Sequence, residues 1–166
     1  MKRSKILYTV ITALFIVFLG SCQKDPEVGG TATQALAGDW FVQWKELPGT
    51  YFHFTTYNTA ANSQTEMWLD DNYSFWSSTG DEQLKGKVTV NASSLSFSGD
   101  NIANVDPNMP ITFSIKNGKV IPNGAKGPGS NAPTDSIYFE AEFSDDPGTT
   151  YIISGYRRTG FDADEQ

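Results

Sequence analysis

The chain of 166 residues has a single cysteine, Cys22, and a single histidine, His53. A lone cysteine excludes an internal disulfide and a cysteine-rich zinc site, and a lone histidine excludes a metal centre built from several imidazoles. Long apolar runs are also lacking, because the longest one, residues 7–19, is too short to span a membrane comfortably. We therefore expect neither a metal ion nor another cofactor.

Positive charge is scarce: 12 lysine and arginine residues stand against 19 aspartate and glutamate residues, which gives a net charge of −7. Such an acidic balance argues against a nucleic acid as partner. Aromatic residues make up 13% of the chain and charged residues only 19%, a composition that favours a packed core over disorder. The length fits one ordinary domain and is short for two.

The first 21 residues have the organisation of an export signal. Lys2, Arg3 and Lys5 form a basic start, and the apolar run follows. The run ends in Leu19-Gly20-Ser21-Cys22, which resembles the lipobox of bacterial lipoproteins, where signal peptidase II cuts before the cysteine and the thiol carries diacylglycerol. We therefore predict lipidation of Cys22. The alternative is an ordinary secretory signal, or a membrane anchor, with an incidental cysteine.

This prediction divides the chain into a signal peptide of residues 1–21, a lipidated cysteine with a flexible tether over residues 22–35, and a single domain of residues 36–166. Removal of the signal takes away three positive charges and no negative one, so the net charge of the mature chain changes from −7 to −10. An acidic body is repelled by anionic lipid, so the acyl chains must provide the attachment to the membrane.

The residues after the cysteine, Gln23-Lys24-Asp25-Pro26-Glu27, look like the acidic export signals that direct lipoproteins of Bacteroidetes to the outer face of the outer membrane. We therefore expect an outer-membrane lipoprotein that is exposed at the cell surface, or otherwise at the periplasmic face. The alternative is a solvated spacer without an address, for which the composition Gly29-Gly30-Thr31 is also suited.

From Trp40 onward, apolar residues alternate with polar ones at a period of two, and turn-forming residues recur too often for long helices. This pattern predicts an all-β protein, namely an antiparallel up-and-down barrel of about 8–10 strands. Asn117-Gly118 predicts a two-residue hairpin. Residues 122–134 show no apolar periodicity and predict a long loop, either a mobile lid or a disordered segment.

Gly38-Asp39-Trp40, at the start of the first predicted strand, resembles the G-x-W signature of lipocalins and the wider calycin group. Barrels of that group carry an arginine from the end of the last strand across the tryptophan. The resemblance therefore implies that Arg157 or Arg158 closes the barrel against Trp40.

Five further segments carry a second resemblance. They are Tyr57-Asn58-Thr59-Ala60-Ala61-Asn62-Ser63, Glu66-Met67-Trp68-Leu69-Asp70-Asp71, Phe75-Trp76, Lys85-Gly86-Lys87-Val88 and Ser154-Gly155-Tyr156-Arg157-Arg158-Thr159-Gly160-Phe161. Together they resemble a lipoprotein family of Bacteroidetes described as "lipid-binding putative hydrolase", over about residues 36–161. The resemblance implies a calycin-like barrel and a lipid-like ligand, and it assigns no catalytic residue to a position of this chain.

His53 is the only imidazole available as the base of a Ser-His-Asp type hydrolase. Asp70 or Asp71 could orient its ring, and a serine could attack an ester. The chain has no Gly-x-Ser-x-Gly elbow, however, and a lone histidine on a strand beside aromatic residues is more often structural. Asp70-Asp71-Asn72 also gathers hard oxygen ligands of the kind that bind calcium, but capping of a turn is the favoured interpretation.

Four large aromatic residues, Trp44, Tyr57, Trp68 and Trp76, are the candidates for a ligand site, because they lie nearest the predicted barrel mouth. There they would accept an acyl chain or a sterol-like molecule, or stack against sugars. The alternative is ordinary packing, since small barrels fill their interiors with side chains.

These features predict a membrane-anchored barrel that binds a small hydrophobic or amphipathic, lipid-like molecule. Two other functions stay open. One is a weak ester or lipid hydrolase that uses His53. The other is a non-catalytic accessory module that binds a protein partner in a surface assembly for glycan uptake or adhesion.

Overall fold

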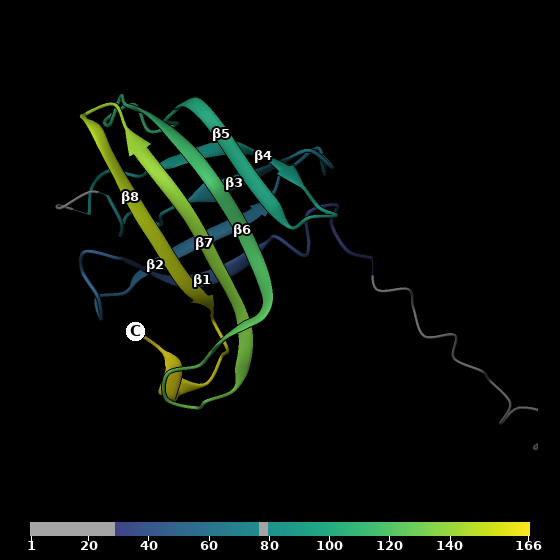
Figure 1. Ribbon diagram of the computed structural model, residues 1–166. Coiled ribbons are helices and arrows are strands. Elements are labelled where there is room, and N and C mark those ends of the chain that lie inside the picture. The colour runs from purple at the N-terminus through teal and green to yellow at the C-terminus, as the bar shows by residue number, and fades with distance from the viewer. Residues whose placement is uncertain (1–28, 77–79) are drawn as a thin grey trace, which may run out of the picture.

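The computed structural model of the protein describes residues 29–76 and 80–166, which fold into a closed barrel (Figure 1). Its antiparallel strands follow one another in chain order, and the first pairs with the last. The elements are β1 (Gly38–Trp44), β2 (Phe52–Asn58), β3 (Glu66–Asp70), β4 (Lys85–Asn91), β5 (Ser96–Ala103), β6 (Thr112–Lys126), β7 (Pro133–Phe143), β8 (Asp146–Arg157) and the 3-10 turn η1 (Asp162–Asp164). The predicted all-β, up-and-down barrel is confirmed, with eight strands. Within the described residues, no helix has the length and apolar character needed to cross a membrane.

Apolar side chains from alternating strand positions fill the interior of the barrel. On β3, Met67 and Leu69 are fully buried, whereas Trp68 between them is partly exposed. The other strands contribute inward side chains in the same way, among them Trp40, Val42, Phe54, Val88, Phe97, Phe113, Ile115, Ile137, Phe139 and Ile153. The described part of the chain therefore forms a packed core of the kind that small barrels build.

The seam between β1 and β8 depends on Gly155. This residue lies opposite Val42 in the register, and a Cβ atom built on it would lie 2.1 Å from the carbonyl oxygen of Phe41. That separation is far below van der Waals contact, so a larger residue would force the two strands apart. The missing side chain at this position allows the barrel to close.

The predicted hairpin at Asn117-Gly118 is wrong. This dipeptide lies inside β6, at a register shift between Lys116 and Lys119. Asn117 and Asn123 have positive φ angles of 55° and 52°, and each lies at an irregularity of the β6–β7 ladder. Asparagine adopts the left-handed conformation more readily than most residues, so it accommodates a β-bulge as well as a turn.

The predicted long loop over residues 122–134 is also wrong. β6 continues to Lys126 and β7 begins at Pro133, so only residues 127–132 form the turn. The bulges keep this polar, glycine-rich stretch in the ladder although it has no apolar alternation. An extended hairpin, visible in green in Figure 1, therefore replaces both the lid and the disordered segment that the sequence suggested.

The barrel has two ends with separate sets of loops. The tether end, where the chain enters the barrel, comprises the lead-in segment of residues 29–37 and the loops 59–65, 92–95 and 127–132. The distal end comprises the loops 45–51, 71–84, 104–111 and 144–145, of which residues 77–79 are not described. The C-terminal turn η1 lies at the tether end, where Asp164 accepts hydrogen bonds from the backbone of Gly129 and Ser130.

Candidate functional site

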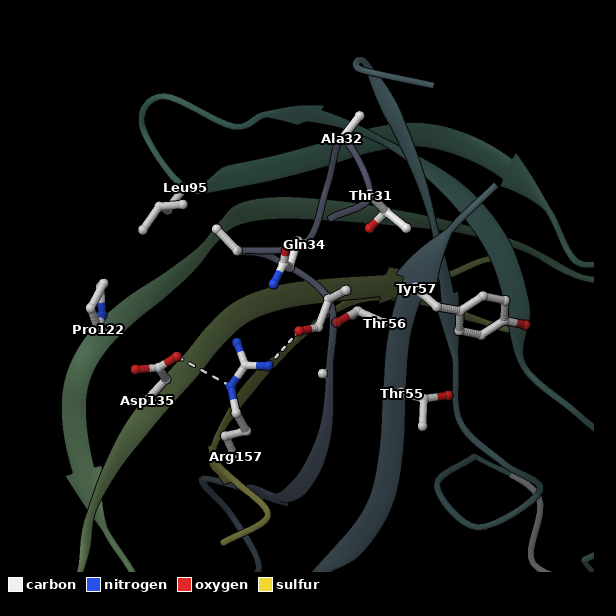
Figure 2. Close-up of a pocket in the computed structure, with 13 residues that line it drawn as sticks. Thr31, Ala32, Gln34, Thr55, Thr56, Tyr57, Leu95, Pro122, Asp135 and Arg157 are labelled. Carbon is white, nitrogen blue, oxygen red and sulfur yellow. Dashed lines mark hydrogen bonds and ion pairs between the residues drawn. The ribbon is translucent and has the colours of Figure 1, made fainter. Parts of the chain in front are cut away.

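Arg157 and Trp40 close the barrel at the tether end. The guanidinium carbon of Arg157 lies 4.5 Å from the centre of the Trp40 ring. Arg157 Nη1 donates to the carbonyl oxygen of Ala37, and its Nε donates to the Asp135 carboxylate at 3.2 Å (Figure 2). Trp40 Nε1 donates to Thr56 Oγ1 at 2.9 Å. This is the placement that the calycin resemblance implies for Arg157.

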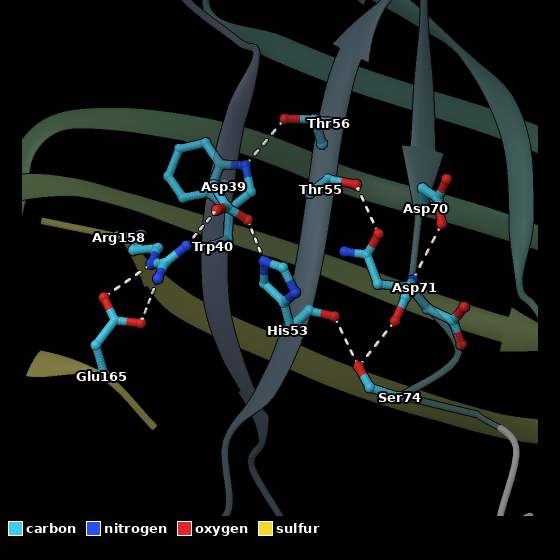
Figure 3. A network of polar contacts seen from close by, with 11 residues as sticks. Asp39, Trp40, His53, Thr55, Thr56, Asp70, Asp71, Ser74, Arg158 and Glu165 are labelled. Carbon is cyan, nitrogen blue, oxygen red and sulfur yellow. Dashed lines mark hydrogen bonds and ion pairs between the residues drawn. The ribbon is translucent and has the colours of Figure 1, made fainter. Parts of the chain in front are cut away.

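Arg158 occupies a different position, on the outside of the barrel. Its guanidinium group lies 3.4 Å from the Asp39 carboxylate and 2.7 Å from that of Glu165 (Figure 3). Arg158 therefore links β1 to the C-terminal tail and does not cross Trp40.

The lead-in segment packs across the tether end of the barrel and covers it. Leu36 is fully buried, and its carbonyl oxygen accepts a hydrogen bond from Thr56 Oγ1 at 2.7 Å. The backbone nitrogen of Ala32 donates to Asn62 Oδ1 at 2.8 Å. These contacts hold the segment to β2 and to the loop that follows it, so its outer surface forms one wall of a groove at this end of the barrel.

An open groove of about 940 Å³ borders the lead-in segment at the tether end (Figure 2). Ala35, Leu95 and Pro122 contribute apolar surface, and Asp135 and Arg157 contribute charged groups. Because the barrel interior is packed with side chains, this groove lies at the end of the barrel and not within it. It places an apolar surface directly beside an ion pair.

Leu95 lines this groove in a backbone conformation that leucine rarely adopts. Its φ of 51° lies in the left-handed region, in the loop between β4 and β5. A residue with a Cβ atom loses roughly 1–2 kcal/mol there, and glycine or asparagine is the usual occupant. The side chain packs against the core while bordering the groove. Strained residues of this kind cluster at binding sites, so Leu95 is a functional candidate.

Trp44 and Trp76 lie together at the distal end, with ring centroids 6.0 Å apart. Phe75 packs edge-on against Trp44 at 5.2 Å, and Trp76 stacks on Phe143 at 3.8 Å. The indole nitrogen of Trp44 is buried and has no hydrogen-bond partner among the described residues. These rings form an aromatic cap over the distal end of the core.

Tyr57 and Trp68 lie on the outer surface, where they are cross-strand neighbours on β2 and β3. The ammonium group of Lys85 lies 5.4 Å from the Tyr57 ring centroid and 5.6 Å from that of Trp68. Of the four aromatic candidates, Tyr57 alone borders the groove, and its ring is directed away from Arg157 (Figure 2). The structure therefore does not gather the four into one cavity, because strand alternation turns Tyr57 and Trp68 outward.

Asp70 is a buried carboxylate beside these outer rings. It accepts hydrogen bonds from the backbone of Asn72 at 3.0 Å, from Tyr57 Oη at 2.9 Å and from Gln83 Nε2 at 2.7 Å, and it pairs with Lys85 Nζ at 3.1 Å. Burial acts to raise the pKa of Asp70, but these donors outweigh it and lower the pKa below its usual value. The carboxylate thus fixes the positions of the Tyr57 and Lys85 side chains.

We expect Asp70→Asn to lower the free energy of unfolding by about 2 kcal/mol at neutral pH, because hydrogen bonds to a charged group are lost. The lowered folded-state pKa means that ionised Asp70 stabilises the fold above its unfolded-state pKa of about 3.9, and that this contribution disappears as the pH falls through the folded-state value. Urea unfolding across this acidic range should therefore show a shallower loss of stability in Asp70→Asn than in the parent.

The exposed Asp81 provides the matched control for this measurement. Asp81→Asn should change the free energy of unfolding by less than about 0.5 kcal/mol, as substitutions at exposed positions usually do. If Asp70→Asn also follows the parent, the hydrogen bonds around Asp70 do not contribute to the acid sensitivity of the fold.

Asp71 is fully buried and caps the turn after β3. Its Oδ1 accepts hydrogen bonds from the backbone of Leu84 at 2.8 Å and Tyr73 at 3.1 Å, and its Oδ2 accepts from Trp76 at 3.2 Å and Phe75 at 3.4 Å. Burial raises the pKa of Asp71 in spite of these donors. The capping interpretation is confirmed. Across residues 29–76 and 80–166, no three His, Cys, Asp or Glu side chains converge on a possible metal site.

His53 contacts Asp39, and not Asp70 or Asp71 (Figure 3). Its Nε2 is hydrogen-bonded to Asp39 Oδ1 on the outer face of β1 and β2. Ser74 Oγ donates to the backbone carbonyl of His53 at 2.7 Å. In the part of the chain that the structure describes, no hydroxyl group is hydrogen-bonded to the imidazole. The described geometry therefore pairs a base with a carboxylate and supplies no nucleophile.

Three groove residues, Leu95, Pro122 and Asp135, are absent from the candidates that the sequence provides. They belong to different parts of the chain and meet only because the barrel closes. For Leu95 the sequence holds one local signal. The turn that ends at this residue, Asn91-Ala92-Ser93-Ser94-Leu95, contains no glycine, so a residue with a side chain must occupy its left-handed position.

Comparison with known proteins places the fold in a family. No curated protein matches the chain. Residues 25–162 match the model of a family described as "lipid-binding putative hydrolase". The match includes all eight strands and both arms of the Trp40–Arg157 closure. The chain therefore belongs to the lipid-binding putative hydrolase family.

Proposed function

We propose that the protein is an outer-membrane lipoprotein, anchored through Cys22 and exposed at the cell surface, that binds an amphipathic, lipid-like molecule in the groove at the tether end. The observation that carries the proposal is the groove itself, about 940 Å³ in volume, with apolar side chains beside the Asp135–Arg157 ion pair. This volume lies within the usual range of small-molecule sites.

The two parts of the groove suit the two parts of such a ligand. Leu95 and Pro122 offer apolar surface to a hydrocarbon chain, whose transfer from water contributes about 0.8 kcal/mol per buried CH₂ group. Arg157 and Asp135 offer donors and acceptors to a polar head. Because the pair carries both signs of charge, a zwitterionic head group, or one with hydroxyl or amide groups, fits it better than a bare carboxylate.

The anchor is supported by the sequence alone, since Cys22 lies outside the residues that the structure describes. The basic start, the apolar run and Leu19-Gly20-Ser21-Cys22 agree with one another. Exposure at the cell surface is supported by the acidic segment Gln23-Lys24-Asp25-Pro26-Glu27.

Leu95→Trp tests the groove by filling it. We expect native mass spectra of the full chain, released gently from detergent micelles, to show a retained lipid in the parent and at least about tenfold less in Leu95→Trp. Val105→Trp, at an exposed position of the distal end, is the matched control and should retain the lipid. Retention in both variants would show that the ligand does not occupy the groove.

Leu95→Asn separates ligand binding from folding. Asparagine tolerates the left-handed conformation, so relief of backbone strain offsets part of the lost packing, and the free energy of unfolding should change by less than about 1 kcal/mol. Lipid retention should nevertheless fall, because the apolar wall of the groove is gone.

The filled interior favours a second candidate function, an accessory module that binds a protein partner through its outer face. The partly exposed neighbours Tyr57 and Trp68 provide aromatic surface for such a contact. A parent protein with no retained lipid, together with a stable partner that co-purifies with it, would favour this function over lipid binding.

A further inference from the structure

Charge is distributed unequally between the two ends of the barrel. The lead-in segment and the three loops of the tether end, residues 29–37, 59–65, 92–95 and 127–132, contain no charged residue at all. The four loops of the distal end, residues 45–51, 71–84, 104–111 and 144–145, contain six acidic residues and one basic residue. An anionic lipid surface therefore repels the loops of the distal end more strongly than those of the tether end.

The C-terminal tail brings one basic and three acidic residues, Arg158, Asp162, Asp164 and Glu165, to the tether end. Arg158 pairs with Glu165 at 2.7 Å. Asp164 is buried and accepts hydrogen bonds from Gly129, Ser130 and Thr159. Asp162 stays exposed and the Asp164 carboxylate has no cation partner among the described residues, so the tail adds negative charge beside loops that are themselves uncharged.

The length of chain before the barrel fixes which end lies nearer the anchor. Nine residue steps separate Cys22 from Thr31, and they reach at most about 30 Å when fully extended. β5, which joins a tether-end loop to a distal loop, has eight residues, so at the usual tilt of barrel strands it spans about 20 Å along the barrel axis. The distal loops can therefore lie about 20 Å further from Cys22 than the tether end can.

We propose that the tether end rests against the lipid bilayer, so that the groove opens onto the membrane surface and takes its ligand, a bilayer phospholipid, directly from it. This inference rests on the proposed function, because it assumes both the acyl anchor and the lipid-binding groove. It adds the orientation of the barrel and the source of the ligand.

Two physical effects act in the same direction. Uncharged serine, threonine, asparagine and alanine side chains enter the head-group region without the loss of hydration that a charged side chain suffers. The acidic distal loops are repelled by anionic lipid and turn toward water. The groove, which is bordered by the lead-in segment and by Leu95, then faces the hydrocarbon source.

The orientation can be measured on the full, acylated chain in vesicles of phosphatidylethanolamine and phosphatidylglycerol that contain a nitroxide-labelled lipid. A fluorophore is attached through Ser93→Cys at the tether end or through Asn108→Cys at the distal end, both exposed positions. The acylated Cys22 thiol does not react with the label. We expect quenching of the Ser93→Cys label to be roughly threefold stronger, because the eight residues of β5 place the distal label about 20 Å further from the bilayer.

Added charge provides the matched pair of variants. Ala61→Asp with Ser93→Asp places two carboxylates at the tether end, and Leu47→Asp with Val105→Asp places two at the distal end. The first pair should slow uptake of a fluorescent phospholipid from the vesicles by roughly fivefold, and the second should leave it unchanged. Circular dichroism of both double variants checks that the barrel is intact.

The outcomes separate the orientation from the proposed function. Equal quenching of both labels, or stronger quenching at Asn108→Cys, would overturn the orientation, even if Leu95→Trp still loses lipid in detergent. A protein that fails to stay on the vesicles would contradict the anchor and the orientation together. Stronger quenching at Ser93→Cys together with full lipid retention in Leu95→Trp would support the orientation of the barrel. It would contradict binding of the phospholipid in the groove.

Discussion

Cys22→Ser is expected to remove the protein from the membrane fraction completely, while the parent remains there. In the proposed lipidation diacylglycerol is attached to the Cys22 thiol, which serine lacks, so the variant would carry no acyl chain. Without acyl chains the body would not bind by itself, because its net charge of −10 is repelled by anionic lipid and the acyl chains are the only membrane anchor proposed for it. Fractionation of cells, together with incorporation of labelled palmitate, measures both consequences.

Ser21→Ala is the matched control for this prediction, because it keeps a small residue before the cysteine. It should be acylated and should stay in the membrane fraction. Suppose that Cys22→Ser also stays there without palmitate. The apolar run of residues 7–19 is then itself the anchor, and the chain between the anchor and the barrel is too long to hold the tether end close to the bilayer.

Sequence periodicity predicts a strand where the alternation of apolar and polar residues along the chain is enough to show which side chains are buried. Met67, Trp68 and Leu69 alternate in hydrophobicity, and the structure buries the first and third and exposes the second. The same logic fails at Asn117 and Asn123. An asparagine at positive φ serves a hairpin and a bulge equally well, and only the register with β7 distinguishes the two.

The candidate site is harder to predict because its contacts cross between strands. Asp39 meets His53 because the register pairs Phe41 with His53, which leaves Asp39 as the diagonal neighbour on the same outer face. Neither residue type nor spacing along the chain reveals this register. The sequence therefore provides the histidine but assigns it the wrong carboxylates, Asp70 and Asp71.

The positions of the aromatic side chains also depend on contacts between strands that are far apart in the sequence. Trp44 and Trp76 reach the distal cap, whereas Tyr57 and Trp68 face outward beside Lys85. A tryptophan serves in a core, on a rim or on a surface with little change in local pattern. Closure of the barrel decides among these, and it also creates the groove from residues that no local pattern brings together.

The two ends of the barrel consequently have different roles. The aromatic cap at the distal end completes the core and is held by buried hydrogen bonds to Asp71. The tether end is closed by the lead-in segment and carries the groove. Variants at the distal end should therefore change stability first, whereas variants such as Leu95→Trp should change ligand retention first.

Asp71→Ala should have the largest effect on stability of the substitutions considered, a loss of about 3 kcal/mol in the free energy of unfolding. The carboxylate accepts hydrogen bonds from four backbone N–H groups, and alanine leaves these donors without their acceptor in a buried turn. Two of the donors belong to Phe75 and Trp76, so the aromatic cap should loosen as well. Urea unfolding measures the first effect.

A red shift and lower intensity of tryptophan emission would report the second effect, since Trp76 leaves its stack on Phe143. Asp71→Asn keeps one acceptor oxygen but turns an amide group toward two of the donors, so it should lie between the parent and Asp71→Ala. Asp81→Ala, at an exposed position of the same loop, should change stability by less than about 0.5 kcal/mol. Equal stability of Asp71→Ala and Asp81→Ala would show that water replaces the carboxylate in this turn, and the aromatic cap would then owe its position to ring packing alone.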